Sequence, residues 1–174
     1  MNKNLIAYFS RPGENYIAGK IVSLPTGNTQ LVAEKLQRLT GGDLFRIETV
    51  KPYSEFYTVC TEEAKTEFLA KARPPLVRFP ESIEKYDLIF LGFPNWWGTM
   101  PMSLFTFLEH FDFSDKTIAP FCTHEGSGLG KSERDIKKCC PTASLLPGFE
   151  VRGSQSIRSD QALANWLAEI DLVF

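Results

Sequence analysis

Leu5-Ile6-Ala7-Tyr8-Phe9-Ser10 is a short apolar run that ends in a serine, and Thr26-Gly27-Asn28-Thr29 opens an amphipathic segment that extends to residue 40. We predict a buried strand followed by a helix over residues 27–40, because apolar side chains recur there at helical spacing and Gly41-Gly42 follows. The first amide N–H groups of such a helix have no intrahelical partner, and the helix dipole adds a partial positive charge. The turn is therefore predicted to bind an anion.

The residue types in this turn favour a single phosphate group. Ser10, Thr26, Gly27, Asn28 and Thr29 offer hydroxyl, amide and backbone donors without a positive charge. A Walker loop would place a lysine here and a dinucleotide fold would place a glycine triplet, so their absence favours a monophosphate ester over a di- or triphosphate. Flavin mononucleotide (FMN) is the leading candidate. The alternative is an ordinary helix N-terminus that holds no ligand.

The rest of the chain alternates between strand and helix patterns. We predict strands over residues 43–50, 86–92, 116–123 and 149–157, and helices over about 56–72, 101–111, 132–140 and 159–170. The apolar middle of the strand over 86–92 is typical of a parallel sheet covered on both faces. The predicted fold class is α/β: one domain over residues 1–174, with a five-stranded parallel sheet of order 2-1-3-4-5 and helices on both faces.

In this topology a ligand binds beyond the carboxyl ends of strands one, three and four, where three loops meet. The first loop, residues 10–29, is longer than the two to six residues usual for such a connection. We expect its insertion, residues 11–25, to fold over the ligand or to rim a substrate pocket. Arg11 is predicted either to cap the phosphate or to pair with Glu14.

The second loop contains two adjacent tryptophans between two prolines. Neighbouring side chains point in different directions, so at least one of these indole rings should be free to stack on a flat aromatic ligand. Gly98 permits a backbone conformation that a side chain would resist. The alternative is that both rings pack beneath the following helix. The candidate binding residues of this loop are Pro94, Asn95, Trp96, Trp97 and Gly98.

The third loop is rich in glycine and in hydrogen-bond donors. Successive exposed amides can bind the carbonyl and N1 edge of a flavin ring, and the alternative is a plain surface turn. We assign no catalytic residue. His124 is the candidate proton donor, and the alternative is that it is an ordinary polar residue without a catalytic role. The candidate binding residues are Thr123, His124, Glu125, Gly126, Ser127 and Gly128.

Composition narrows the class of protein. A net charge of −2 gives no basic surface for nucleic acid, and no apolar run is long enough to span a membrane. The four cysteines lack the spacing of a zinc site or a disulfide framework, so we expect reduced thiols and no metal. The N-terminus shows no secretory signal pattern, and the cytoplasm is the expected compartment.

The chain resembles the flavodoxin-like superfamily, and more closely flavodoxin-fold proteins with an insertion in the phosphate-binding loop. The resemblance covers the whole chain, and its most specific segments are residues 10–16, 27–29, 94–101 and 123–130. It implies a three-layer sandwich and bound FMN. It further implies that Ser10, Thr26, Asn28 and Thr29 hold the phosphate, that Trp96 or Trp97 stacks near the isoalloxazine, and that Ser127 and Gly128 lie by its edge.

Two departures from the family pattern affect the expected function. The uninterrupted Ser/Thr-x-Thr-Gly-x-Thr loop of ordinary flavodoxins is split here, which weighs against a pure electron carrier. Glu125 stands where similar chains often have glycine, and a carboxylate pointing at the flavin N1 would lower the potential of the second electron.

We therefore predict an FMN oxidoreductase that takes electrons from NAD(P)H or a protein donor and passes them to a quinone-like acceptor. The alternative is a flavodoxin-type carrier that acts through a redox protein partner, although carriers of this fold usually have a strongly acidic face. A response-regulator-like domain is disfavoured because Ser10-Arg11 stands where an acidic pair is expected. Aromatic residues beside the crevice leave a homodimer open.

Overall fold

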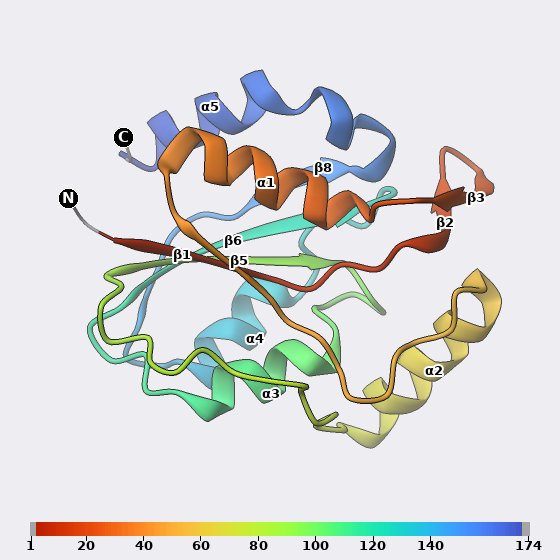
Figure 1. Cartoon of the computed structure of the whole chain (residues 1–174), viewed down its shortest axis with the longest axis horizontal. Helices are drawn as coiled ribbons and strands as arrows, with labels where there is room; N and C mark the ends of the chain where they lie inside the picture. Colours follow the sequence, from red (N-terminus) through yellow and green to blue (C-terminus); the bar gives the residue numbers. More distant parts are fainter. Residues whose placement is uncertain (1–2, 172–174) are drawn as a thin grey trace.

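The computed structural model describes residues 3–171 and contains a parallel sheet between two layers of helices (Figure 1). The strands are β1 (Asn4–Tyr8), β4 (Asp43–Arg46), β5 (Leu88–Pro94), β6 (Thr117–His124), β7 (Ser144–Leu145) and β8 (Phe149–Arg152). Their order is β4-β1-β5-β6, and β7 and β8 pair with successive parts of β6. Because β7 and β8 share the fifth position, the predicted order 2-1-3-4-5 is confirmed.

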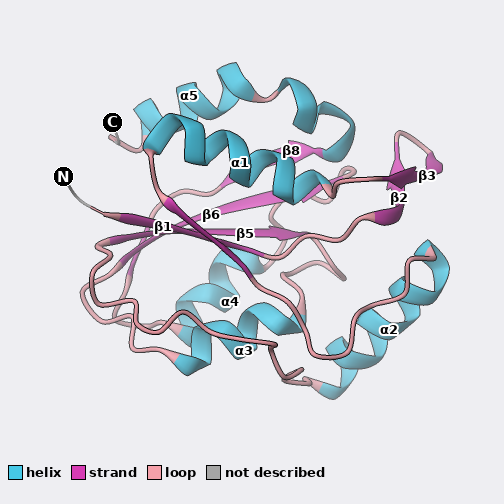
Figure 2. Ribbon diagram, viewed as in Figure 1, coloured by secondary structure: helices cyan, strands magenta, loops and turns pink. Residues whose placement is uncertain are grey.

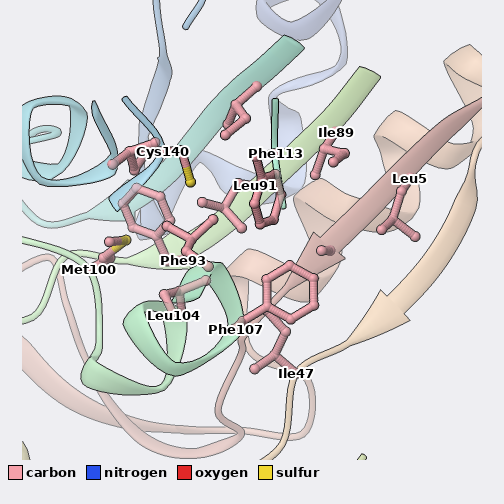
Figure 3. Packing of buried hydrophobic residues seen from close by; sticks show 14 of the residues in the cluster. Leu5, Ile47, Ile89, Leu91, Phe93, Met100, Leu104, Phe107, Phe113 and Cys140 are labelled. Atoms are coloured by element: carbon pink, nitrogen blue, oxygen red, sulfur yellow. The ribbon is translucent and has the colours of Figure 1, made fainter. Parts of the chain in front are cut away.

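Helices α1 (Asn28–Thr40) and α5 (Asp160–Glu169) cover one face of the sheet, and α3 (Met102–His110) and α4 (Ser132–Cys139) cover the other (Figure 2). The side chains of β1 alternate between the two layers, as strand geometry requires. Ile6 and Tyr8 pack with the α1 and α5 side, whereas Leu5 and Ala7 pack with the α3 side. Figure 3 shows the hydrophobic cluster on the α3 side of the sheet, in which Leu91 and Phe93 of β5 face Leu104 and Phe107 of α3.

Helix α2 (Tyr57–Ala70) lies towards the carboxyl ends of the strands, next to a β-hairpin (Figure 1). The hairpin is formed by β2 (Gly13–Ile17) and β3 (Lys20–Leu24), which pair antiparallel and form a separate two-stranded sheet. Ala18 and Gly19 both have positive φ, 48° and 85°, which is the geometry of a type I′ hairpin turn. The insertion over residues 11–25 therefore has a regular structure that the sequence did not predict.

Two predicted strands are too long. The second ends at Arg46 instead of residue 50, because the chain then leaves β1 and Thr49 bridges to Leu76. The fifth ends at Arg152 instead of residue 157, and Gly153–Arg158 forms a 3₁₀ helix, η1. The Ser156 hydroxyl donates to the Gly153 carbonyl and so closes this turn. Gly41 ends α1 in the left-handed conformation, as predicted.

The described part of the chain has no helix long and apolar enough to cross a lipid bilayer. The prediction of one domain covers residues 1–174, of which residues 1–2 and 172–174 lie outside the described range. One-domain organisation remains a prediction.

Candidate functional site

A cavity of about 480 Å³ lies where the carboxyl ends of β1, β5 and β6 meet, at the place that the topology predicts. Thirteen of the seventeen predicted binding residues line it: Ser10, Arg11, Asn28, Thr29, Pro94, Asn95, Trp96, Trp97, Gly98, Thr123, His124, Glu125 and Ser127. Thr26, Gly27, Gly126 and Gly128 are not among its lining residues. The three loops therefore meet at one cavity.

The N-terminus of α1 forms one end of the cavity. The Ser10 hydroxyl accepts a hydrogen bond from the Gln30 amide at 3.1 Å, so it caps the helix from outside the turn. Within residues 3–171 the amide N–H groups of Asn28 and Thr29 have no acceptor. Two unpaired amides at the positive end of a helix suit a phosphate group.

Gly27 makes this end a narrow concavity. A Cβ added there would meet Ser10 Oγ and would lie 2.7 Å from the Arg11 carbonyl oxygen and 2.9 Å from the Arg11 amide nitrogen. A side chain at residue 27 would therefore collide with backbone that cannot move aside easily. Gly27 therefore shapes the turn without lining the cavity.

Neighbouring elements fix the polar side chains of this turn. The Asn28 Oδ1 accepts a hydrogen bond from Ser156 Oγ of η1 at 3.0 Å. The buried hydroxyls of Thr29 and Thr123 lie 2.8 Å apart and link α1 to the end of β6. These contacts position the side chains before any ligand binds, which lowers the entropic cost of binding.

The Arg11 guanidinium contacts backbone carbonyl groups. It donates to the carbonyl oxygens of Ser54 at 3.1 Å and Glu55 at 3.2 Å, and to that of Glu14. Arg11 thus bonds to the Glu14 backbone, and a role in capping the phosphate stays a prediction. Arg11 ties the start of the hairpin to the segment before α2, and it also lines the cavity.

The tryptophan pair forms a tight turn in the second loop. Trp96 and Thr99 exchange backbone hydrogen bonds of 2.8 and 3.3 Å. Between them Trp97 and Gly98 have φ values of 56° and 82°, which again is type I′ geometry. A positive φ at tryptophan is uncommon and costs energy, and such strain is often found at functional sites.

The two indole rings have separate environments. Trp96 packs edge-on against Phe9 and Tyr53, with ring centroids 5.2 and 4.9 Å away. Trp97 is 42% exposed, and its Nε1 donates to the Thr61 carbonyl of α2 at 3.1 Å. The two rings thus have different neighbours, and Trp97 is the more exposed of the two.

Asn95 joins the second loop to the third. Its Nδ2 donates to the Gly128 carbonyl at 2.7 Å, and its Oδ1 accepts from the Gly98 amide at 3.0 Å. His124 Nδ1 accepts from the Gly126 amide at 2.8 Å. A neutral imidazole with this contact carries its proton on Nε2. Gly126 and Gly128 thus shape the loop rather than line the cavity.

The Glu125 carboxylate is already engaged by backbone donors. One oxygen accepts from the Ser154 amide at 2.8 Å and the other from the Ala18 amide, at the tip of the hairpin, at 3.1 Å. A Cβ added at Gly153 would lie 3.1 Å from Glu125 Oε1 and would also meet Asn28 Nδ2. The carboxylate therefore lies near the α1 turn and joins its own loop to the hairpin and to η1, and its effect on the flavin potential stays a prediction.

Sequence reasoning missed several lining residues: Asn15 of β2, Gly153 of η1, and Tyr57, Cys60, Thr61 and Ala64 of α2. The four α2 residues are spaced i, i+3, i+4 and i+7, which places them on one face of the helix. That spacing was readable in the sequence, but nothing local indicates that this face turns towards the cavity. Tyr16, which belongs to the 11–25 insertion expected to fold over the ligand or to rim a substrate pocket, also lines the cavity.

Cys60 is buried in the cavity wall. Burial raises the pKa of its thiol to about 11, so the group is neutral near pH 7. The described residues contain no group of three or more histidine, cysteine, aspartate or glutamate side chains that could hold a metal ion.

The comparisons with known proteins agree with this architecture. Residues 3–170 match the family model Flavodoxin_4, described as flavodoxin. A flavodoxin from Haemophilus influenzae is 27% identical over 109 residues, which cover 60% of this chain and 48% of that protein. The match thus spans about half the length of that curated relative.

Two solved structures extend the likeness over nearly the whole chain. A protein described as a flavoprotein from Bacteroides eggerthii is 31% identical, with a TM-score of 0.79, over 98% of this chain and 99% of that one. A flavoprotein from Lactobacillus acidophilus in complex with FMN is 17% identical, with a TM-score of 0.66, over 95% and 99% of the two chains, and it shows the shared fold. The chain therefore belongs to the flavodoxin family, with a flavodoxin-like fold that binds FMN, as the sequence predicted.

Proposed function

We propose that the cavity is the FMN site, with the phosphate at the N-terminus of α1 and the isoalloxazine ring beside the turn of Trp96 and Trp97. The observation that carries this orientation is the pair of amides at Asn28 and Thr29, unpaired within residues 3–171, in the same cavity as the exposed indole of Trp97. A phosphate recognises the first feature and a flat ring the second. The loop over residues 123–128 would then lie along the flavin edge.

The residues of the chain bind, orient and shield the cofactor in this proposal. Ser10, Asn28 and Thr29 hold the phosphate, and the 2.8 Å contact between Thr29 and Thr123 fixes the distance between the α1 turn and the β6 loop. When bound, FMN supplies one- and two-electron redox chemistry. His124 Nε2 is the candidate proton donor on the cavity wall.

We further propose an oxidoreductase that takes electrons from NAD(P)H or a protein donor and passes them to a quinone-like acceptor. What supports it is the additional wall that the hairpin and α2 contribute to the cavity, through Tyr16, Tyr57 and Thr61. An FMN-binding carrier needs no such wall, whereas an enzyme with a small substrate does. The second candidate is an electron carrier, favoured by the exposed Trp97, on which a redox protein could dock.

The absorbance spectrum of the protein with added FMN, followed by stepwise anaerobic reduction, tests the proposal. We expect shifted flavin bands, reduction in one two-electron stage, and reoxidation by a quinone after reduction with NADH or NADPH. Two separate one-electron stages without quinone reoxidation would favour the carrier. No FMN binding would refute both. A homodimer and a cytoplasmic location remain predictions.

A further inference from the structure

We propose that Tyr16, Tyr57 and Trp97 form a subsite for the electron acceptor, and that the subsite takes a planar, electron-poor ring with carbonyl oxygens, that is, a quinone. This inference rests on the proposed FMN site and names the residues that would select the substrate. It is carried by the geometry of the tyrosine pair and by its two phenolic hydroxyls, which have no hydrogen-bond partner within residues 3–171.

The two tyrosines come from different elements and are stacked on each other. Tyr16 lies in β2 and Tyr57 is the first residue of α2. Their ring centroids are 6.1 Å apart with 29° between the ring planes, within the range of favourable aromatic pairs. Both line the cavity, and Tyr16 is 44% exposed, so the pair presents aromatic surface to an incoming ligand.

Hydrogen bonds hold this pair in place. The Glu14 amide donates to the Glu55 carbonyl at 2.8 Å, and the Glu14 carboxylate accepts from the Tyr57 amide at 2.9 Å. The hairpin is thus fixed to the first turn of α2, and Arg11 adds bonds to the same segment. A wall that is fixed before binding loses little entropy when a ligand arrives.

The phenolic hydroxyls are available donors. Neither the Tyr16 nor the Tyr57 hydroxyl has a hydrogen-bond partner within residues 3–171, whereas the Tyr53 hydroxyl donates to Glu67 and the Tyr86 hydroxyl to Asp43. Phenol rings are electron-rich and stack well on electron-poor rings, and their O–H groups can donate to carbonyl oxygens at the ring edge. A quinone offers both complementary features in one flat molecule.

Trp97 supplies a further wall of the subsite. Its indole is held by the Thr61 carbonyl, and Lys65 Nζ lies 5.2 Å from its ring centroid. Cys60 and Ala64, which have small side chains, also line the cavity on this face of α2. The Glu14 carboxylate accepts from the Tyr57 amide and does not line the cavity.

Equilibrium binding to the oxidised, FMN-loaded protein tests the subsite without any turnover. The probe is 1,4-naphthoquinone, followed by the difference absorbance of the flavin band, and naphthalene serves as a probe of the same shape without carbonyl oxygens. The variant with both Tyr16→Phe and Tyr57→Phe keeps the stacked rings and removes both donors. We expect it to bind the quinone about 10-fold more weakly or worse, with unchanged affinity for naphthalene and FMN.

A second variant tests the stacking. Tyr57→Leu should weaken the binding of both naphthoquinone and naphthalene. Its matched control is Phe56→Leu, because Phe56 is the neighbouring aromatic residue, is 56% exposed and does not line the cavity. The control should bind both probes as the parent protein does. Quinone binding that is absent in the FMN-loaded parent, or unchanged in the double phenylalanine variant, would overturn the subsite and leave the FMN site standing. Failure of the parent to bind FMN would overturn both.

Discussion

Asn28→Asp is the most direct test of where the phosphate binds. The substitution is almost isosteric, and the aspartate keeps an oxygen for the hydrogen bond from Ser156 Oγ, which is 3.0 Å long. The new carboxylate would lie at the turn where the Asn28 and Thr29 amides are unpaired. If the FMN phosphate binds those amides, two like charges are forced into close contact.

The expected loss of affinity follows from Coulomb's law. Two unit charges about 4 Å apart repel by about 4 kcal/mol at an effective dielectric constant of about 20, and a phosphate carries up to two charges. Water at the open side of the cavity reduces the repulsion. We expect a loss of about 2–4 kcal/mol, which is about 30- to 1,000-fold in Kd.

Fluorescence titration with FMN and with riboflavin measures this loss and contains its own control. Riboflavin has the same ring and no phosphate, so its affinity should stay within about twofold of the parent value if only phosphate repulsion changes. Asn165→Asp is the matched protein control, since Asn165 is exposed on α5 and the substitution gives the same net charge. An equal loss for FMN and riboflavin, or no loss for either, would refute the proposed orientation.

Three further predictions concern the same cavity. Gly27→Ala should destabilise the fold by about 1–3 kcal/mol and weaken the binding of FMN more than that of riboflavin, because its Cβ would push against Ser10 Oγ and the Arg11 backbone. Denaturant unfolding measures the stability, and titrations with the two flavins measure the affinities. A variant with the stability and the affinity of the parent protein would contradict the predicted steric clash. Trp96→Ala should cost about 3–5 kcal/mol in stability, since its ring packs on two other aromatic rings. Trp97→Ala should change the absorbance spectrum of the bound flavin and cause a smaller loss of stability than Trp96→Ala. A larger loss of stability for Trp97→Ala in unfolding experiments would show that the environments of the two tryptophans are misassigned. The Cys60 thiol, whose pKa burial raises to about 11, should react with iodoacetamide far more slowly than a free cysteine at pH 8. The alkylation rate should rise as the pH approaches the pKa of the thiol, because only the thiolate reacts. Mass spectrometry of the alkylated peptide measures this rate. A rate at pH 8 equal to that of the unfolded chain would refute the prediction.

Local patterns were enough to predict the order of the main elements and the place of the cavity. The apolar run at the start of the chain, the continuous one in β5 and the amphipathic α1 each carry their own periodicity, so their type could be read directly. Strand ends were less predictable. Apolar and β-branched residues continue past Arg46, and the strand stops there because the chain leaves its partner, not because of a local signal.

The roles of charged and aromatic side chains were the least predictable part of the site. Arg11 and Glu125 are charged residues in loops, and sequence alone offered them a phosphate and a flavin edge as partners. In the structure, Arg11 contacts the backbone of the segment before α2 and Glu125 contacts the tip of the hairpin, both distant in sequence. These backbone groups come close to Arg11 and Glu125 only when the hairpin packs against α2.

The sequence by itself thus indicated the parallel sheet, its order and a helix N-terminus suited to an anion, because hydrophobic periodicity and helix-terminal chemistry are encoded over a few adjacent residues. Only the tertiary structure decided that residues 13–24 form a hairpin beside α2, that Trp97 is more exposed than Trp96, and that Tyr16 stacks on Tyr57. Those features depend on packing between segments about 40 to 80 residues apart, whose free energy of contact leaves no trace in local sequence pattern.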